Sequence, residues 1–311
     1  MEADKLMKKQ GYRFLGDHSA LKICTWTKKA ITNQGVCYKS QFYGIQSHLC
    51  AQITPTFNCT QQCIFCWRDH TLHNQISMDK LDDPKAILTN IPLAQKSLLS
   101  GVGGHTKVDK KLWKESDHPK HLAISLNGEP TLYPKLNELI TEAHKLKYTT
   151  FVVTNGSQPE TLKKITPPTQ LYLSLDAPNE ELFLTVNKPS KKDAWKDLLN
   201  SLKVLKNLKK KTRTAIRITC IKDINMIEPE NYAKLIETAS PHFVEVKAFM
   251  LLGGSRNRLM LSNMPRHHEV KAFAEEICQH SEYKIIDEHS KSRVCLLMKE
   301  DFQERIMKFN Q

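Results

Sequence analysis

Three cysteines stand close together in the segment CTQQCIFCW, at Cys59, Cys63 and Cys66. A structural zinc site or an ordinary iron–sulfur cluster takes four protein ligands, so a group of three predicts a metal centre with one position open for another molecule. The alternative is a zinc site that a histidine completes, with His70 or His73 as the fourth ligand. The cysteines alone are consistent with both kinds of site.

A second group of three cysteines lies upstream, at Cys24, Cys37 and Cys50, with twelve residues between successive members. Three thiols without a fourth again predict an iron–sulfur cluster with an open iron, now in the N-terminal segment. Three buried free cysteines are the alternative. The cysteines that remain are assigned mostly to free thiols in the core, and they are Cys220, Cys278 and Cys295.

Short apolar segments alternate with amphipathic ones along most of the chain. The apolar segments end in Gly, Asn, Asp or Pro, which is typical of buried strands followed by turns. The amphipathic segments have apolar residues at three- and four-residue spacing, which predicts helices. The expected strands are 49–57, 121–130, 149–156, 171–178, 214–222 and 243–254, and the expected helices are 79–99, 134–147, 191–211, 229–239 and 265–281.

About six βα units in a row predict an α/β fold with parallel strands, either an open sheet or a barrel. Both arrangements place their sites at the carboxyl ends of the strands. We expect an irregular N-terminal extension over 1–48, the βα domain over 49–290, and a C-terminal extension over 291–311. A hairpin or edge strand is expected near the C-terminus, and the polar segment 101–120 is expected to be a functional or mobile loop.

The composition fits a globular protein with a polyanionic partner. Hydrophobic residues make up 40% and charged residues 25%, and the formal net charge is +13. Such a charge attracts phosphate backbones, so RNA is the expected partner. We expect no membrane association and a cytoplasmic location, since apolar runs of about 20 residues and a secretion signal are both absent from the sequence.

The spacing Cys59-x3-Cys63-x2-Cys66 resembles the signature of the radical S-adenosylmethionine (radical SAM) enzymes. The resemblance implies a [4Fe–4S] cluster whose fourth iron binds S-adenosylmethionine (SAM). One electron then cleaves SAM to a 5′-deoxyadenosyl radical. It also implies a partial (β/α)6 TIM-like barrel, here with a cysteine-bearing N-terminal extension, and it places Phe65 near the adenine.

Other segments resemble the SAM-binding turns of the same family. NGEP at 127–130 is similar to the turn that holds the SAM ammonium group, and TNG and SLD follow the next two expected strands. The resemblance implies contacts with the SAM carboxylate or ribose at the latter two. The implied SAM-binding residues are Asn127, Gly128, Glu129, Thr154, Asn155, Ser174 and Asp176.

Several longer segments resemble the sequences of the archaeal tRNA 4-demethylwyosine synthases, which act in wybutosine biosynthesis. Among these segments are QSHLCAQITPTFNCTQQCIFCWRD, HLAISLNGEPTLYP and GGSRNRLMLSNMP, and the resemblance runs over about 20–290. It implies a carbon–carbon lyase that condenses pyruvate with N1-methylguanosine at position 37 of tRNA(Phe). Two [4Fe–4S] clusters would take part, and the second would bind pyruvate. We expect a monomer that receives electrons from a separate flavodoxin- or ferredoxin-like donor.

Closing the new ring of the base requires loss of the pyruvate carbonyl oxygen, for which a lysine Schiff base is a plausible route. Lys39, two residues after Cys37, is the first candidate, and Lys247 in the apolar segment VEVKAFM is the second. The alternative for Lys247 is an ion pair with Glu245 or with the SAM carboxylate, because an unpaired ammonium in a core is costly.

Basic and aromatic residues are expected to hold the RNA. Arg256 and Arg258 follow the sixth expected strand and are assigned to phosphate contacts, and Trp67 and Phe42 are candidates for stacking on a base. Core packing is the alternative for Trp67. Two other functions stay open, a different radical SAM enzyme that modifies RNA and a zinc-stabilised RNA-binding protein without catalysis.

Overall fold

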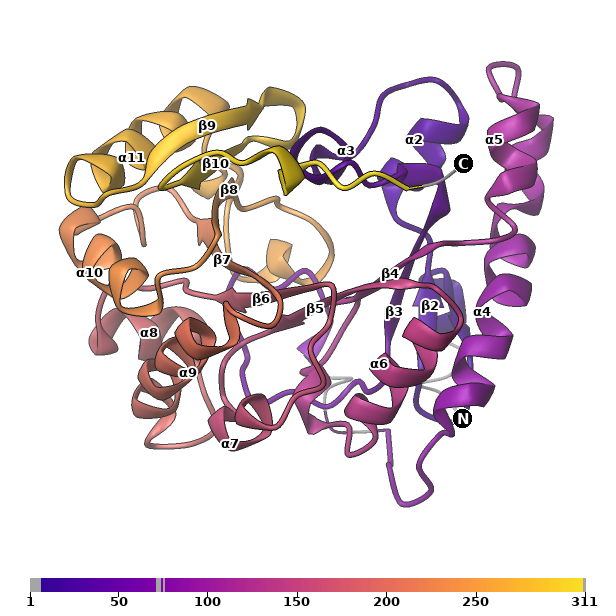
Figure 1. Ribbon diagram of the computed structural model, residues 1–311, viewed down its shortest axis with the longest axis horizontal. Coiled ribbons are helices and arrows are strands. Elements are labelled where there is room, and N and C mark those ends of the chain that lie inside the picture. Colours follow the sequence, from indigo (N-terminus) through magenta and orange to yellow (C-terminus); the bar gives the residue numbers. More distant parts are fainter. Residues whose placement is uncertain (1–6, 71–73, 75, 310–311) are drawn as a thin grey trace. The chain divides into compact units, whose positions relative to one another are not determined.

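The chain forms two compact units in the computed structural model, which describes residues 7–70, 74 and 76–309 (Figure 1). The first unit comprises the described residues of Met1–Asn58, Leu72–Val152 and Glu304–Gln311. The second comprises those of Cys59–Thr71 and Val153–Gln303. Both units contain parallel strands that are followed by helices.

The sheet of the first unit combines both strand directions. β1 and β2 pair antiparallel, and β2 pairs antiparallel with β3. From β3 onward the pairing is parallel, with Cys50 opposite His121 and His121 opposite Thr149. β4 is buried along its whole length, as an apolar central strand should be. The strands are β1 (Tyr12–Phe14), β2 (Ala20–Lys22), β3 (Cys50–Thr54), β4 (His121–Ile124) and β5 (Thr149–Thr154).

The helices of the first unit include the expected helix after the first parallel strand. Asp83 caps it by accepting from the backbone N–H groups of Lys85 and Ala86, and Pro84 occupies the first turn. This helix, α4, packs beside α6 (Figure 1). The helices are α2 (Thr25–Ile31), α3 (Tyr38–Tyr43), α4 (Pro84–Leu99), α5 (Lys110–Glu115) and α6 (Leu136–Lys145), with 3-10 turns at Ser47–Leu49, Ser100–Gly104 and Pro130–Leu132.

Two segments are more regular than expected, while the functional or mobile role of 101–120 stays a prediction. The described part of 1–48 contains β1, β2, α2 and α3, which are too short to show a periodic pattern in the sequence. The segment 101–120 contains α5, whose start is capped by Asp109. Trp113 fixes it to the preceding helix, because its indole Nε1 donates to the Leu99 carbonyl at 3.0 Å.

The sheet of the second unit is parallel from β6 through β7 to β8, with Ile216 opposite both Leu173 and Val244. β10 then pairs antiparallel with β8 and with β9. The expected C-terminal hairpin is therefore confirmed. The strands are β6 (Gln170–Ser174), β7 (Arg213–Cys220), β8 (Phe243–Ala248), β9 (Lys284–His289) and β10 (Val294–Met298).

Helices follow the parallel strands of the second unit in sequence order, and α10 packs against both α9 and α11 (Figure 1). α8 was not expected. It has eight residues, and its first turn is capped by Asn179, which accepts from Leu182 N at 2.9 Å. The helices are α7 (Pro159–Lys163), α8 (Glu180–Asn187), α9 (Ala194–Leu208), α10 (Pro229–Ala239) and α11 (His267–Gln279), with 3-10 turns at Gly253–Asn257, Leu261–Asn263, Ser290–Ser292 and Gln303–Arg305.

The six expected strands and five expected helices are confirmed as β3 to β8 and as α4, α6, α9, α10 and α11. Apolar strand residues such as Leu122, Ile216 and Val246 are fully buried. Of the described helices, none combines the length and the apolar character that spanning a bilayer would demand.

Candidate active site

The loop from Cys59 to Cys66 is held on one side by the end of α8. The backbone N–H of Gln62 donates to the Asn187 carbonyl at 3.1 Å, and that of Ile64 donates to the Val186 carbonyl at 2.9 Å. These bonds give an irregular loop the backbone partners that it lacks internally. The loop is therefore fixed in position by residues far away in the sequence.

The segment after β8 holds the loop on its other side. The Nε atom of Arg258 donates to the Ile64 carbonyl at 3.1 Å, and its Nη2 atom donates to the Cys66 carbonyl. Gly253 lies so close that a Cβ atom added to it would be 2.2 Å from the Trp67 carbonyl oxygen, and its φ is +51°. Only glycine suits such an approach.

The three loop cysteines are half-buried, and the charges of Cys59 and Cys66 act on the Cys63 thiol. Burial raises the pKa of Cys63 well above its usual value, and the charges of Cys66 and Cys59 raise it further. Amide groups face the sulfurs, because Asn155 Nδ2 lies 3.8 Å from Cys59 Sγ and Asn187 Nδ2 lies 3.6 Å from Cys63 Sγ. Three thiols with N–H donors fit a cationic cluster that would hold them as thiolates.

A buried carboxyl group faces this loop. Burial raises the pKa of Asp176 to about 6, and its charge raises the pKa of Cys63. Its Oδ1 atom accepts from Thr219 N at 2.9 Å. Of the other residues expected to bind SAM, Thr154 is buried and accepts from Gly156 N at 3.1 Å, and Ser174 is half-buried at the end of β6.

Phe65 is partly buried. It packs with Ile64 against a hydrophobic cluster of Val186, Ile221, Phe249 and Leu259. Its expected contact with adenine stays a prediction.

The expected turn at Asn127 to Glu129 lies in the first unit, against the end of β3. Gly128 has a φ of +63°, and a Cβ atom there would lie 2.2 Å from the Thr56 carbonyl oxygen. The backbone N–H of Glu129 donates to the Asn58 carbonyl at 2.7 Å. The Glu129 carboxylate accepts from the Thr131 hydroxyl at 2.6 Å, so the turn has a fixed shape.

The second group of cysteines gathers within the first unit. Cys24 and Cys37 directly precede α2 and α3, and Cys50 begins β3. Burial raises the pKa of Cys50 to about 12, and the Cys24 charge raises it further, while Lys39 lowers it. The charges of Cys24, Cys37 and Lys39 thus all act on Cys50, and a second cluster at these cysteines stays a prediction.

The two candidate lysines have different surroundings. Lys39 Nζ lies 5.2 Å from the centre of the Phe151 ring, beside the cysteines of the first unit. Lys247 Nζ, in the second unit, donates to the Ser292 carbonyl at 2.9 Å. Glu245, proposed as a partner of Lys247, accepts from Arg217 Nε at 3.2 Å.

The C-terminal segment supports α3, the helix that carries Lys39. Arg305 Nη1 donates to the Phe42 carbonyl and Met307 N donates to the Tyr43 carbonyl, both at 3.0 Å. Phe42 itself is fully buried, so its expected role in stacking on an RNA base is wrong. Its ring packs on the Tyr38 ring instead, with centroids 5.6 Å apart.

The residues expected to bind RNA differ in exposure. Arg256 is exposed, and 36% of the Trp67 surface is exposed. Two of the Arg258 nitrogens bind loop carbonyls. The phosphate contacts of Arg256 and Arg258 and the stacking of Trp67 on a base stay predictions. His73, an alternative zinc ligand, lies outside the described residues.

The remaining cysteines agree with the sequence prediction. Cys220, Cys278 and Cys295 are free thiols, and Cys220 and Cys295 are fully buried, as expected of core cysteines.

Sequence reasoning missed Asn187 because α8 was not expected. It also missed the structural role of Arg258, since contacts between residues 64 and 258 leave no local pattern in the sequence.

Comparison with known proteins first gives the class. Residues 53–236 match the family described as "Radical SAM superfamily", and the cysteine loop and the parallel βα order agree with it. The chain is therefore a radical SAM protein with the expected partial (β/α)6 barrel, and the family implies SAM and a [4Fe–4S] cluster. Residues 238–299 match a second family, described as "Wyosine base formation".

Comparison with individual relatives then identifies the family within this class. The S-adenosyl-L-methionine-dependent tRNA 4-demethylwyosine synthase of Pyrococcus abyssi is 46% identical over 96% of this chain and 89% of its own length. That of Methanocaldococcus jannaschii is 41% identical over 96% of both chains. A solved structure of TYW1 with a lysine-pyruvate adduct bound has a TM-score of 0.86 at 40% identity, over 96% of this chain and 95% of that one. The chain belongs to the tRNA 4-demethylwyosine synthase family.

Proposed function

We propose that this chain condenses pyruvate with N1-methylguanosine at position 37 of tRNA(Phe) to form 4-demethylwyosine, acting as a carbon–carbon lyase. The observation that carries the proposal is the second group of thiols, Cys24, Cys37 and Cys50, with Lys39 beside it. A radical SAM protein needs one group of three cysteines for its own cluster. A second group beside a lysine supports chemistry on a second substrate.

The residues have distinct proposed roles. Cys59, Cys63 and Cys66 would hold the first [4Fe–4S] cluster, which with SAM supplies a radical that removes hydrogen from the methyl group of the base. Cys24, Cys37 and Cys50 would hold a second one, whose open iron can act as a Lewis acid toward pyruvate. Asn155 and Asn187 would orient the first group of thiolates through their N–H groups. The residues proposed to bind SAM are Asn127, Gly128, Glu129, Thr154, Asn155, Ser174, Asp176 and Phe65.

Lys39 is the proposed nucleophile toward pyruvate. Its neutral amine would add to the carbonyl carbon of pyruvate and form an imine with release of one water molecule, which removes the carbonyl oxygen from the ring-closing step. The position of Lys39 beside Cys50 supports this choice over Lys247, whose ammonium is bound to the Ser292 carbonyl. The lysine-pyruvate adduct in the solved structure of TYW1 supports a lysine in this role.

Further proposals concern the partners. The RNA would contact exposed Arg256 and Trp67. A separate flavodoxin- or ferredoxin-like protein would supply the electron, and the chain would act as a monomer in the cytoplasm.

The test is a single-turnover reaction under anaerobic conditions. The protein is incubated with SAM, dithionite, isotopically labelled pyruvate and tRNA(Phe) bearing N1-methylguanosine, and the digested RNA is analysed by mass spectrometry. We expect a tricyclic base that carries two labelled carbons of pyruvate. Cleavage of SAM without a labelled base would contradict the proposed substrates, and tRNA with unmethylated guanosine is the control.

A further inference from the structure

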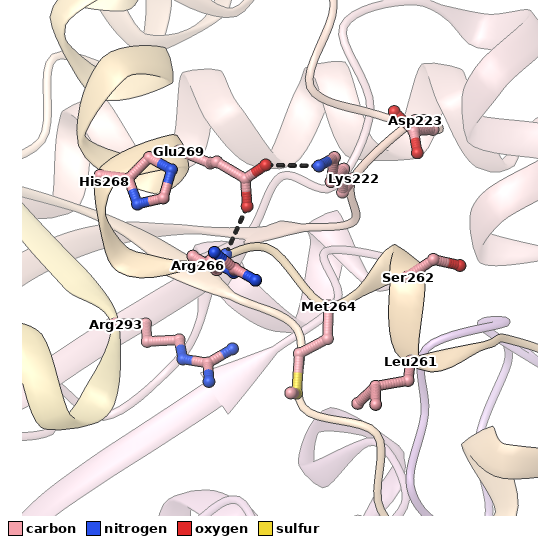
Figure 2. A pocket seen from close by; sticks show the side chains of 9 residues that line it. All are labelled: Lys222, Asp223, Leu261, Ser262, Met264, Arg266, His268, Glu269 and Arg293. Atoms are coloured by element: carbon pink, nitrogen blue, oxygen red, sulfur yellow. Dashed lines mark hydrogen bonds and ion pairs between the residues drawn. The ribbon is translucent and has the colours of Figure 1, made fainter.

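A basic pocket with a volume of about 710 Å³ lies at the carboxyl ends of β7 and β8 in the second unit (Figure 2). Lys222 reaches it from the turn after β7, Arg266 from the start of α11, and Arg293 from the turn between β9 and β10. In barrels of parallel strands, binding sites lie at this end. The carboxyl end of the neighbouring strand β6 carries Ser174 and Asp176, which are assigned to SAM.

The positive charges in the pocket exceed what its carboxylates neutralise. Glu269 Oε1 lies 2.5 Å from Lys222 Nζ, and Glu269 Oε2 accepts from the backbone N–H of Arg266 at 2.7 Å. Among the residues that the structure describes, no carboxylate forms an ion pair with the guanidinium of Arg266 or Arg293. Figure 2 shows these two arginines on one side of the pocket and Asp223 on the other. An anion would offset this excess charge.

Two residues that line the pocket have a left-handed backbone. Asp223 has a φ of +63° and Arg293 a φ of +49°. Arginine is rare in this conformation, because its Cβ atom crowds the backbone. The side chain of Arg293 extends into the pocket (Figure 2), and its Nη1 atom donates to the Pro265 carbonyl at 2.9 Å. Arg293 ends the 3-10 turn Ser290–Ser292 in this conformation, and its bond to Pro265 holds its side chain at the pocket.

The segment after β8 connects the pocket to the cysteine loop. Arg258 of this segment binds the loop carbonyls, and three residues later Leu261 forms part of the pocket wall. Met260 and Leu261 are 68% and 66% exposed. Cations beside exposed apolar side chains suit a nucleic acid, because phosphates meet the cations while ribose and bases meet the apolar groups.

We propose that Arg266 and Arg293, together with Lys222, bind a backbone phosphate of the RNA substrate, and that Met260 and Leu261 contact the adjoining nucleotide. This inference rests on the proposed function for its RNA substrate and adds the place where that RNA docks. The segment after β8 would then hold the cysteine loop through Arg258 and contact the RNA through Met260 and Leu261.

The test measures the affinity of the iron-loaded protein for tRNA(Phe) bearing N1-methylguanosine as a function of salt. We expect Arg266→Ala to weaken binding roughly tenfold and to lower the slope of log affinity against log salt by about 1. Arg293→Gly should have the same effect. Glycine favours the left-handed backbone at this position, so Arg293→Gly should not lower Tm, and weaker binding could not be ascribed to misfolding.

Lys234→Ala is the matched control, since it removes one exposed positive charge on α10 outside the pocket. It should leave affinity and slope close to those of the wild type. The RNA site is refuted if Arg266→Ala and Arg293→Gly bind the tRNA as the wild type does. Inorganic pyrophosphate provides a second arm, because a loss of pyrophosphate binding without a loss of RNA affinity would assign the pocket to a small anion and overturn the RNA site.

This binding assay is independent of catalysis. If the wild type makes no labelled base but its RNA affinity still depends on Arg266 and Arg293, the proposed function fails and the phosphate site stands. If labelled base forms while neither arginine affects RNA affinity, the proposed function stands and the phosphate site fails.

Discussion

The Nε atom of Arg258 donates a hydrogen bond to the carbonyl oxygen of Ile64 at 3.1 Å, in the middle of the loop that carries Cys59, Cys63 and Cys66. A second donation from the same guanidinium reaches the Cys66 carbonyl. A planar group with several fixed N–H donors can serve two carbonyls at once, whereas the ammonium of a lysine cannot match that geometry. Arg258 therefore positions the loop that carries the proposed cluster ligands.

Arg258→Lys should make the first cluster more labile. Losing a charged hydrogen bond costs about 1.5–3 kcal/mol, so release of iron to a chelator should accelerate by roughly tenfold or more. The measurement follows the decay of the iron–sulfur absorbance under anaerobic conditions. Arg256→Lys, two residues earlier and exposed, is the control and should release iron at the wild-type rate. Equal decay in both variants would contradict the role of Arg258.

Gly128→Ala should destabilise the first unit. The left-handed backbone costs a residue with a Cβ atom about 1–2 kcal/mol, and here that atom would also lie 2.2 Å from the Thr56 carbonyl oxygen. Chemical denaturation of the apo protein should therefore show a loss above 2 kcal/mol, as a rough lower bound. Gly104→Ala is the control, because its Cβ atom would meet nothing within 4 Å.

Lys39→Ala should abolish the trapping of pyruvate. An imine between Lys39 and pyruvate can be reduced with borohydride, which leaves a stable secondary amine and a mass increase that peptide mapping locates. The Lys247→Ala variant should still form the reduced pyruvate adduct, and that adduct should lie on Lys39. Retention of the adduct in Lys39→Ala, or its appearance on Lys247, would transfer the proposed role to Lys247.

Replacing cysteines of the second group should halve the iron content. The triple variant of Cys24, Cys37 and Cys50 to serine should fall from about eight to about four irons per chain, the count for two clusters and for one. It should still cleave SAM slowly with dithionite, because the first group is unchanged. Cys278→Ser, which alters a free half-buried thiol, should retain the full count. Eight irons in the triple variant would exclude a second cluster at this place.

Lowering the pH should reduce the free energy of unfolding of the apo protein through His121. Burial lowers its pKa to about 3, and the charges of His48 and Lys120 lower it further. Its Nε2 atom accepts from Gln46 N at 3.2 Å, which requires a neutral ring. Because the folded pKa is depressed, the stabilisation is complete above the unfolded value of about 6.5 and is lost as the pH falls toward 3.

The expected size follows from these two pKa values. Between pH 7 and pH 5 the free energy of unfolding should fall by about 2 kcal/mol through this residue alone. Urea denaturation at both pH values measures it. His121→Gln does not titrate, so the difference between the two pH values should shrink by that amount. An unchanged difference would show that His121 is not responsible.

The sequence predicted the periodic part of the fold well. β3 to β8 and the long helices have apolar patterns that repeat at the period of their own structure, so local residues suffice to predict them. α3 and α8 were missed because six and eight residues hold too few turns for a periodic pattern. Tertiary contacts stabilise such short helices, and α3 depends on Arg305 for one of them.

The sequence predicted the cysteines of the candidate site but not the side chains that hold the cysteine loop in position. The cysteines proposed to bind the clusters could be picked out by their spacing, because a loop that wraps a cluster has a fixed length. The side chains that hold this loop could not, since Asn187 and Arg258 lie more than 120 residues from the thiols and carbonyls that they contact. Phe42 was misjudged because an aromatic residue in a short helix gives no local sign of whether it faces the core or the solvent.

The bonds from Arg305 and Met307 to α3 have a consequence for how the protein is made. These two residues come more than 260 positions after α3 in the sequence, so the helix that carries Lys39 gains these neighbours only after both sheets have been synthesised. The cluster proposed for the segment between Cys24 and Cys50 should therefore be inserted after residues 305 and 307 have been added, and a chain released before them would leave this segment open to oxidation.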